Sequence, residues 1–472
     1  MLEVGAIIIL APLLSVIHLN NNSFRGNEPL SLHYSLLSWA QLAVSTYGGT
    51  AVNRDHQPLF FGLLKLVRNL GFESEFALRL VPITAYLLGL LALYFFLQRL
   101  QIPRLASVII VTLSALDPLI LGTSHYIRPY SLYFALTFLS LLAFERFLEI
   151  KPRGLITLGA VNFVGTLCFG FFALIVLYEA SYIAVQAKRQ KLKRLPIFVS
   201  FLPTFIVIGA YLTKVANYRF IYRVGRDARQ DIFNYERLIE PWLDSSVLGL
   251  YALLLVVSGG WSLLFSARPF PLRYLFLSCL SVGTLLFLKY GLGLDEIKDL
   301  YCVFLPALIY GGYVQMVSEI CSLQSTYRTS LIAALLSLLV VITPLLTPSL
   351  LTLTNPKQHS NQHRRAATYL VAHRWDRKRV ISNHPFKFNK YIIPVLDIVE
   401  LEQSGSSPAS QSTESSADGN KSESRILYAI FKEGEIDSNA VLEPVKSYPC
   451  DRWHFFSNPG YPGCLYLCLS NS

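Results

Sequence analysis

Three groups of polar residues have side chains suited to acid, base or anion chemistry. The first is Arg25-Gly26-Asn27-Glu28-Pro29, which follows an apolar stretch near the N-terminus. A carboxylate placed just beyond an apolar helix, such as Glu28, can serve as a general base, because partial desolvation raises its pKa toward neutrality. The alternative is a helix N-terminus, in which Asn27 is the cap and Glu28 interacts favourably with the helix dipole.

The second group is Asp55-His56-Gln57-Pro58-Leu59. Asp55 is a second candidate acid or metal-contacting carboxylate, and His56 has the chemistry to meet an anionic leaving group. The alternative is again a helix cap followed by proline in the first turn. These residues alone favour neither interpretation.

The third group is Ser124-His125-Tyr126-Ile127-Arg128-Pro129-Tyr130, a short turn between two apolar stretches. The planar guanidinium of Arg128 suits a phosphate held at that level. The alternative is an arginine that anchors a helix end by extending its charged head into water.

The elements that must position these groups are membrane helices. The chain has 472 residues, of which 53% are hydrophobic and only 15% are charged, against about 25% charged in ordinary soluble domains. The apolar residues fall in long blocks, which indicates a polytopic α-helical membrane protein. We expect eleven spans, at about 4–19, 77–97, 105–121, 131–148, 155–168, 170–187, 196–213, 247–266, 274–290, 301–319 and 331–349.

The net charge of +11 is explained by the placement of the basic residues. The densest run, from Lys188 to Arg194, lies between two apolar blocks, and such runs mark the cytoplasmic side. Nucleic acid is therefore excluded as a partner, and membrane lipids are expected. We predict an inner-membrane protein with a cytoplasmic N-terminus, a retained first span and an extracytoplasmic C-terminus.

Three regions then lie outside. Two of them, 20–76 and 214–246, belong to a predicted membrane domain of residues 1–349, and the third is 350–472. In the first, Leu30–Ala43 and Leu59–Leu70 are amphipathic stretches typical of helices that lie along the membrane interface. The third region, 350–472, is predicted to be a small α/β domain with a disordered Ser-rich loop at 404–424. Its expected elements are a helix at 364–374 and strands at 379–382, 391–395, 425–431 and 465–470.

Several devices that bind cofactors are not found in the sequence, among them the P-loop, GxGxxG after a strand, HExxH and paired Cys/His spacing. We therefore expect no cofactor, and the sequence leaves open whether a divalent cation assists. Of seven cysteines, Cys450, Cys464 and Cys468 are those with the context to form a disulfide.

The three polar groups also carry a resemblance to a known family. Asp55 to Phe61, followed by Gly71 to Leu80, resembles the H-P-P-L-Y-Y and F-G-x-S-E-x-A-L-R-L signature of bacterial GT-C membrane glycosyltransferases. This is the family-39-like group, related to protein O-mannosyltransferases and aminoarabinose transferases. The turn from Ser124 to Leu132 resembles the group's S-x-x-A-R-x-Y-S-L segment, and Tyr301 to Leu308 is similar to its R-Y-x-x-x-L-P-A-L segment. Arg364 to Leu370 resembles the start of its outer domain.

The chain departs from the family pattern at several positions. Asn27-Glu28 stands where the family has Asp-Glu, so only Glu28 corresponds to the loop acid. Gln57 replaces the first proline of His-Pro-Pro, and Leu300 replaces the late arginine, which leaves Lys298 as the nearest base.

The resemblance implies a fold, a reaction and roles for these residues. Family members move a sugar from a polyprenyl-phosphate carrier, with inversion, to a glycan, lipid or protein acceptor on the outer face. By this likeness Glu28 or Asp55 is the catalytic base. The lipid phosphate is bound by His56, Arg128 and Tyr130, and by Lys298 as the base nearest to the replaced arginine.

Two other classes of function stay open. A transporter or flippase for lipid-linked sugars normally buries charges near the bilayer midplane. Here Asp117 is expected near an outer helix end, Glu145 near an inner end and Glu179 within the sixth span, so no relay is evident. A membrane scaffold without activity is the third class.

Overall fold

The computed structural model describes residues 5, 28–47, 58–150, 152–190, 194–223, 254–260, 272–286, 303–322, 379–382, 398–400, 426–432, 453–457 and 464–470. The chain divides into two compact units, Met1–Ile17 with Tyr34–Leu351 and His18–His33 with Thr352–Ser472. The first unit holds a bundle of apolar helices and the second holds a β-sheet.

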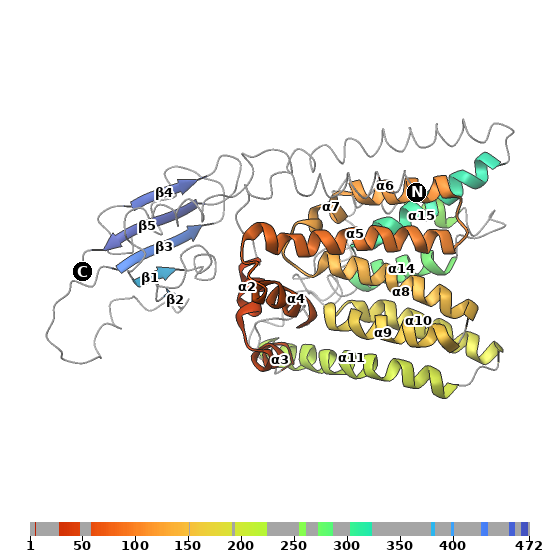
Figure 1. Cartoon of the computed structure of the whole chain (residues 1–472), viewed down its shortest axis with the longest axis horizontal. Helices are drawn as coiled ribbons and strands as arrows, with labels where there is room; N and C mark the ends of the chain where they lie inside the picture. The colour runs from red at the N-terminus through yellow and green to blue at the C-terminus, as the bar shows by residue number, and fades with distance from the viewer. Residues whose placement is uncertain are drawn as a thin grey trace. The chain divides into compact units, whose positions relative to one another are not determined.

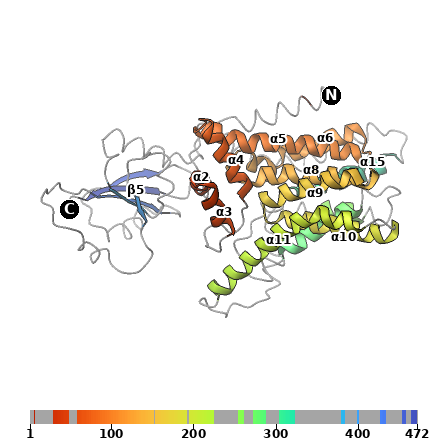
Figure 2. The same cartoon turned by 60° about the horizontal axis from the view of Figure 1, so that its bottom comes forward.

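The helical bundle is built from long apolar helices that run back and forth beside one another (Figures 1 and 2). Within the described residues, three helices are long and apolar enough to cross a membrane, at Glu75–Arg99, Tyr130–Glu149 and Leu195–Thr213. The chain is an integral membrane protein. The bundle comprises α5 (Glu75–Arg99), α6 (Arg104–Leu116), α7 (Pro118–Ser124), α8 (Tyr130–Ile150), α9 (Pro152–Cys168), α10 (Phe172–Gln190), α11 (Arg194–Arg223), α14 (Leu272–Leu286) and α15 (Leu305–Ser322).

The pair α5 and α8 forms the centre of the bundle, and its close approach depends on a glycine. A Cβ atom added at Gly89 of α5 would clash with the Phe134 ring and crowd the backbone at Ala135, so only glycine permits this packing. The buried faces are apolar and aromatic, with Phe96 and Phe138 packed at a ring-centroid distance of 5.9 Å. Where the two helices end, an ion pair joins Arg99 to Glu149.

The predicted split of residues 155–187 is confirmed, because α9 ends at Cys168 and α10 begins at Phe172. The prediction of one helix over 105–121 is wrong, since the chain bends between α6 and α7. Asp117 has extended backbone, and its side chain accepts hydrogen bonds from the N–H groups of Leu119 and Ile120. Pro118 then occupies the first position of α7, which favours a new helix start over continuation.

The segment Leu30–Ala43 is also not one helix. It is divided into α2 (Glu28–Leu36) and α3 (Trp39–Tyr47). The N–H of Ser38 donates to Gln41 Oε1 at 2.9 Å, and the N–H of Gln41 donates to Ser38 Oγ at 3.2 Å. This reciprocal capping box, spelled S-x-x-Q in the sequence, starts a second helix. The other stretch, Leu59–Leu70, is confirmed as a helix, α4 (Pro58–Asn69), and its position along the membrane interface stays a prediction.

The second unit contains a five-stranded sheet in the order β2-β1-β3-β5-β4. Three expected strands are found, as β1 (Arg379–Ser382), β3 (Ile426–Lys432) and β5 (Cys464–Ser470), and two were not predicted, β2 (Ile398–Glu400) and β4 (Trp453–Ser457). The strand β1 is parallel to β2 and to β3, whereas β5 is antiparallel to β3 and to β4. The expected helix at 364–374, the strand at 391–395 and the Ser-rich loop lie outside the described residues.

The sheet limits the expected disulfide pairing. Cys464 and Cys468 lie four residues apart on β5, so their Cα atoms are separated by about 13 Å of extended chain. A disulfide spans about 4.4 to 6.8 Å between Cα atoms. These two cysteines therefore cannot pair with each other, and a pair within this group must include Cys450.

Some of the remaining predicted spans fall wholly or partly outside the described residues, and the others correspond to helices of the structure. The spans at 4–19 and 331–349 are not described beyond residue 5, and of 247–266 the structure describes a helical stretch at 254–260. The spans at 77–97, 131–148, 196–213, 274–290 and 301–319 correspond to α5, α8, α11, α14 and α15. The count of eleven spans and the orientation of the termini stay predictions.

Candidate active site

The Arg128 turn, residues 124–130, connects α7 to α8 and is held by its own backbone. The N–H of Tyr126 donates to the carbonyl of Thr123 at 3.2 Å, and the N–H of Arg128 donates to the carbonyl of Tyr126 at 2.6 Å. From α8, Ser131 Oγ donates to the carbonyl of Thr123 at 2.9 Å. These bonds fix the path of the chain on both sides of the arginine.

Arg128 itself is buried, with 5% of its surface exposed. An arginine that anchors a helix end would extend its charged head into water. The low exposure of Arg128 therefore argues against the anchoring interpretation. A fixed positive charge buried in such a place is suited to bind an anion.

Tyr34 of α2 lies close enough to Arg128 to interact with it electrostatically. Burial raises the pKa of Tyr34 to about 12, and the positive charge of Arg128 opposes that shift. The Tyr34 ring packs against Phe61 of α4 with 4.9 Å between centroids. The turn thus lies within electrostatic range of α2, a helix of the first predicted outer loop, and the Tyr34 phenol is neutral at physiological pH.

Aromatic rings form a floor beneath the Arg128 turn. Tyr126 and Tyr130 are stacked, with centroids 6.2 Å apart and planes inclined by 12°. Tyr130 meets Phe169 edge to face at 5.8 Å, and Tyr133 meets both Phe169 at 4.9 Å and Phe304 at 5.8 Å. Two of the family-like motifs, the Arg128 turn and the segment around Phe304, are therefore brought together.

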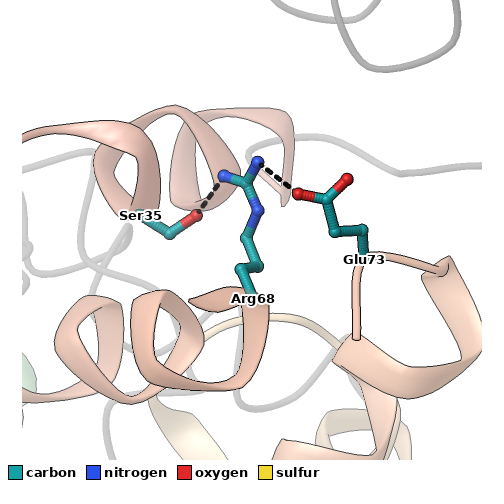
Figure 3. A network of polar contacts seen from close by, with 3 residues as sticks. All are labelled: Ser35, Arg68 and Glu73. Carbon is teal, nitrogen blue, oxygen red and sulfur yellow. Dashed lines mark hydrogen bonds and ion pairs between the residues drawn. The ribbon is translucent and has the colours of Figure 1, made fainter. Parts of the chain in front are cut away.

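Two cations of α4 hold α2 in place, and Figure 3 shows the contacts of one of them, Arg68. Arg68 Nη1 donates to Ser35 Oγ at 3.1 Å, and Arg68 Nη2 lies 3.7 Å from Glu73 Oε1. Lys65 Nζ donates to the carbonyl of Leu37 at 2.7 Å and lies 5.8 Å from the centre of the Trp39 ring. Both cations satisfy groups at the end of α2, which fixes the helix that carries Tyr34.

Asp117 has a structural role that sequence reasoning left open. It is fully buried, caps α7 and accepts a hydrogen bond from the hydroxyl of Tyr310 of α15 at 2.7 Å. The Tyr86 hydroxyl donates nearby to the carbonyl of Ala115 at 2.6 Å. These contacts tie α5, α6, α7 and α15 together at the base of the Arg128 turn.

The structure describes three of the six predicted site residues. Arg128 and Tyr130 lie in one turn, and Glu28 is buried in the first turn of α2. Asp55, His56 and Lys298 lie outside the described residues. In the part of the chain that is described, no group of three His, Cys, Asp or Glu residues could hold a metal ion.

Sequence reasoning missed Tyr34. Its position within an amphipathic stretch gave it no distinct signal, because an aromatic residue there is expected to be ordinary packing.

Comparisons with known proteins agree in fold. No family model matches the chain and no curated protein matches its sequence. ArnT from Cupriavidus metallidurans bound to undecaprenyl phosphate superposes with a TM-score of 0.54 and 12% identity, over 98% of this chain and 97% of ArnT. Apo ArnT gives a TM-score of 0.52 and 13% identity with the same coverage. The chain has the GT-C fold.

A further match is the archaeal oligosaccharyltransferase AglB from Archaeoglobus fulgidus, in complex with an inhibitory peptide and a dolichol-phosphate. Its TM-score is 0.48 and its identity is 14%, over 83% of this chain and 64% of AglB. The family-like motifs of the sequence thus occur on a GT-C fold, and the ArnT matches extend along almost the whole chain.

Proposed function

We propose that this chain is a membrane glycosyltransferase that moves a sugar from a polyprenyl-phosphate carrier to an acceptor on the extracytoplasmic face. The observation that carries the proposal is the buried Arg128, which lies at a bundle end on an aromatic floor, in a fold like that of ArnT bound to undecaprenyl phosphate. A lipid phosphate is an anion with an apolar tail, and an arginine beside a membrane bundle suits both parts.

In the proposed reaction the acceptor hydroxyl attacks the anomeric carbon of the donor sugar from the face opposite the phosphate. The new carbon–oxygen bond forms as the bond to the phosphate oxygen breaks, and the configuration inverts. The leaving phosphate gains negative charge, which the guanidinium of Arg128 stabilises. Tyr34, neutral at physiological pH, supplies a hydroxyl beside the same charge. His56 and Lys298 are further candidates for contacts to the phosphate.

The proton of the acceptor hydroxyl needs a base, and we assign that role to Glu28. It begins α2, whose following turns carry Tyr34, so both side chains belong to one short helix. The positions differ by six residues, a rise of about 9 Å along the helix. Asp55 is the alternative base. Residues 350–472 and 214–246 are proposed to select the acceptor, which is a glycan, a lipid or a protein.

The test is an assay on the full-length protein in nanodiscs. Polyprenyl-phosphate sugars are supplied as donors with membrane extract as the acceptor source, and release of polyprenyl phosphate is measured together with sugar transfer. Transfer by the wild type and its loss in Arg128→Ala would support the proposal. Movement of the donor across a bilayer without cleavage would identify a flippase. If the protein shows neither sugar transfer nor donor movement with any donor, a scaffold role is left and the proposal is overturned.

A further inference from the structure

A ring of three polar side chains joins α8, α9 and α10 inside the bundle. Ser140 Oγ lies 2.6 Å from Asn162 Oδ1 and 2.8 Å from Glu179 Oε1, and Asn162 Nδ2 lies 2.7 Å from Glu179 Oε2. All three residues are fully buried. Each helix contributes one member, so the ring is the polar connection between three neighbouring helices.

The number of protons in the ring determines the state of Glu179. Three short contacts need three donated hydrogens, one for each contact. Ser140 has one hydroxyl hydrogen, and the amide of Asn162 directs one hydrogen toward Glu179. Ser140 Oγ contacts two oxygens, Asn162 Oδ1 and Glu179 Oε1, and when Glu179 is ionised both of them can only accept a hydrogen bond. One of those contacts would then join two oxygens with no hydrogen between them.

The same count holds if the amide of Asn162 is turned over. Its nitrogen then donates to Ser140 Oγ, and Ser140 donates to Glu179 Oε1. The oxygen of the amide now faces Glu179 Oε2, and this contact again needs a hydrogen. In both orientations the third hydrogen can come only from the carboxyl group of Glu179, so the conclusion does not depend on how the amide is assigned.

The surroundings agree with a neutral side chain. Among the described residues, Ser140 and Asn162 are the hydrogen-bond partners of Glu179, and no Lys, Arg or His forms an ion pair with it. An ionised carboxylate in a membrane bundle without a cation is costly. We propose that Glu179 is protonated in the folded protein and acts as a neutral hydrogen-bond donor that positions α8, α9 and α10 beneath the Arg128 turn.

The ring is connected to that turn through the helix ends. Tyr130 begins α8, and Ser140 follows ten residues later, about 15 Å along the same helix. Cys168 ends α9, and its Sγ lies 3.9 Å from the carbonyl of Pro129. Phe172 begins α10 and packs on Tyr133 at 6.1 Å. A change in how the three helices pack at the ring therefore reaches the aromatic floor.

The first test is vibrational and thermal, and it needs no activity. At about pH 8 exposed carboxyl groups are ionised, so the carbonyl band of a neutral carboxylic acid reports buried protonated groups. The wild-type-minus-Glu179→Gln infrared difference should contain such a band, shifted in D2O. Glutamine has one amide donor and one acceptor and can replace the neutral acid in all three contacts. Its melting temperature should stay within about 1 °C of the wild type.

Two other substitutions should behave differently. Glu179→Leu leaves the Asn162 amide without its acceptor, and Glu179→Asp is one methylene too short to reach both partners. Each should lower the melting temperature by about 3 °C or more. Ser140→Ala should also lower it, whereas Ser114→Ala is the matched control, because the Ser114 hydroxyl donates to the Ile110 carbonyl of its own helix. A missing infrared band, or a Gln variant as unstable as Leu, would overturn the proposal.

A second arm tests the positioning role and rests on the proposed function. Binding of undecaprenyl phosphate to nanodisc samples should weaken about 5-fold or more in Glu179→Asp and Glu179→Leu and be restored in Glu179→Gln. If the wild type does not bind this lipid, the proposed function fails while the infrared result still decides the state of Glu179. If all variants bind like the wild type, the ring does not position the site.

Discussion

Tyr34 and Arg128 lie within electrostatic range of each other, although they belong to different regions of the sequence, one in α2 and the other in the turn before α8. Burial raises the pKa of the Tyr34 phenol to about 12, and the positive charge of Arg128 acts in the opposite direction. This electrostatic interaction couples α2, in the first predicted outer loop, to the arginine that the proposed reaction needs, and it can be measured.

The alkaline stability of the protein should depend on Tyr34. Because its pKa is raised from 10 to about 12 on folding, its contribution is fully present below about pH 10 and is lost as the pH rises toward 12. Tyr34→Phe should therefore show a shallower fall in melting temperature over this range than the wild type. Arg128→Ala should move the loss to higher pH. Identical alkaline profiles for all three proteins would contradict the electrostatic contact.

Donor binding should depend on Arg128. Loss of a charge-assisted hydrogen bond to phosphate costs about 1.5 to 3 kcal/mol, so Arg128→Ala should weaken binding of a polyprenyl-phosphate sugar by about one to two decades. Arg128→Lys should recover part of the loss, because lysine keeps the charge but not the planar fork. The control is Arg99→Ala, which removes an ion pair with Glu149 near the far end of α8. A folded Arg128→Ala variant with wild-type affinity would remove the phosphate role.

Turnover should depend on Glu28. Glu28→Gln keeps the shape of the side chain at the start of α2, so expression and donor binding should be retained. The rate of transfer should fall about 100-fold or more, because the proton of the acceptor hydroxyl loses its base. Asp55→Asn is the matched control. A collapse in that variant with Glu28→Gln near wild type would assign the base to Asp55, and normal rates in both would refute a carboxylate base from this loop.

The anchoring of α2 should depend on the pair Arg68 and Ser35 shown in Figure 3. In a double-mutant cycle with Arg68→Ala and Ser35→Ala, we expect a coupling free energy of about 1 kcal/mol. Glu73→Gln is the comparison, since Glu73 lies 3.7 Å away with a side chain that is 59% exposed. Such an exposed pair contributes about 0 to 1 kcal/mol. Additive effects of the Arg68 and Ser35 substitutions would show that this hydrogen bond does not hold the helix.

The orientation in the membrane can be tested with cysteines introduced at Ser410 and Lys191 in a cysteine-free background. The dense basic run predicts that Lys191 is cytoplasmic and that Ser410 is outside. An impermeant thiol reagent applied to intact cells should label position 410 and spare position 191. Labelling in the reverse pattern would invert the predicted topology.

Breaks in the predicted helices show where sequence patterns were misread. Both interruptions have a local sequence signal. At Asp117-Pro118 the signal is a helix cap followed by proline, and at Ser38 it is a capping box. They were missed because hydropathy was given more weight than capping. Hydropathy averages over a window and cannot detect a change of direction that one hydrogen-bonded side chain produces.

The sequence by itself determined the membrane class and most of the described helices, and it singled out the Arg128 turn as a candidate site, because apolar blocks, basic turns and an arginine between spans are local signals. Only the tertiary structure decided which distant side chains meet. Tyr34 lies within electrostatic range of Arg128, the Tyr310 hydroxyl donates to Asp117, and Ser140, Asn162 and Glu179 close a ring. Residues on different helices have no fixed spacing along the chain. Their contacts follow from how the helices pack, and periodicity within one helix carries no record of its neighbours.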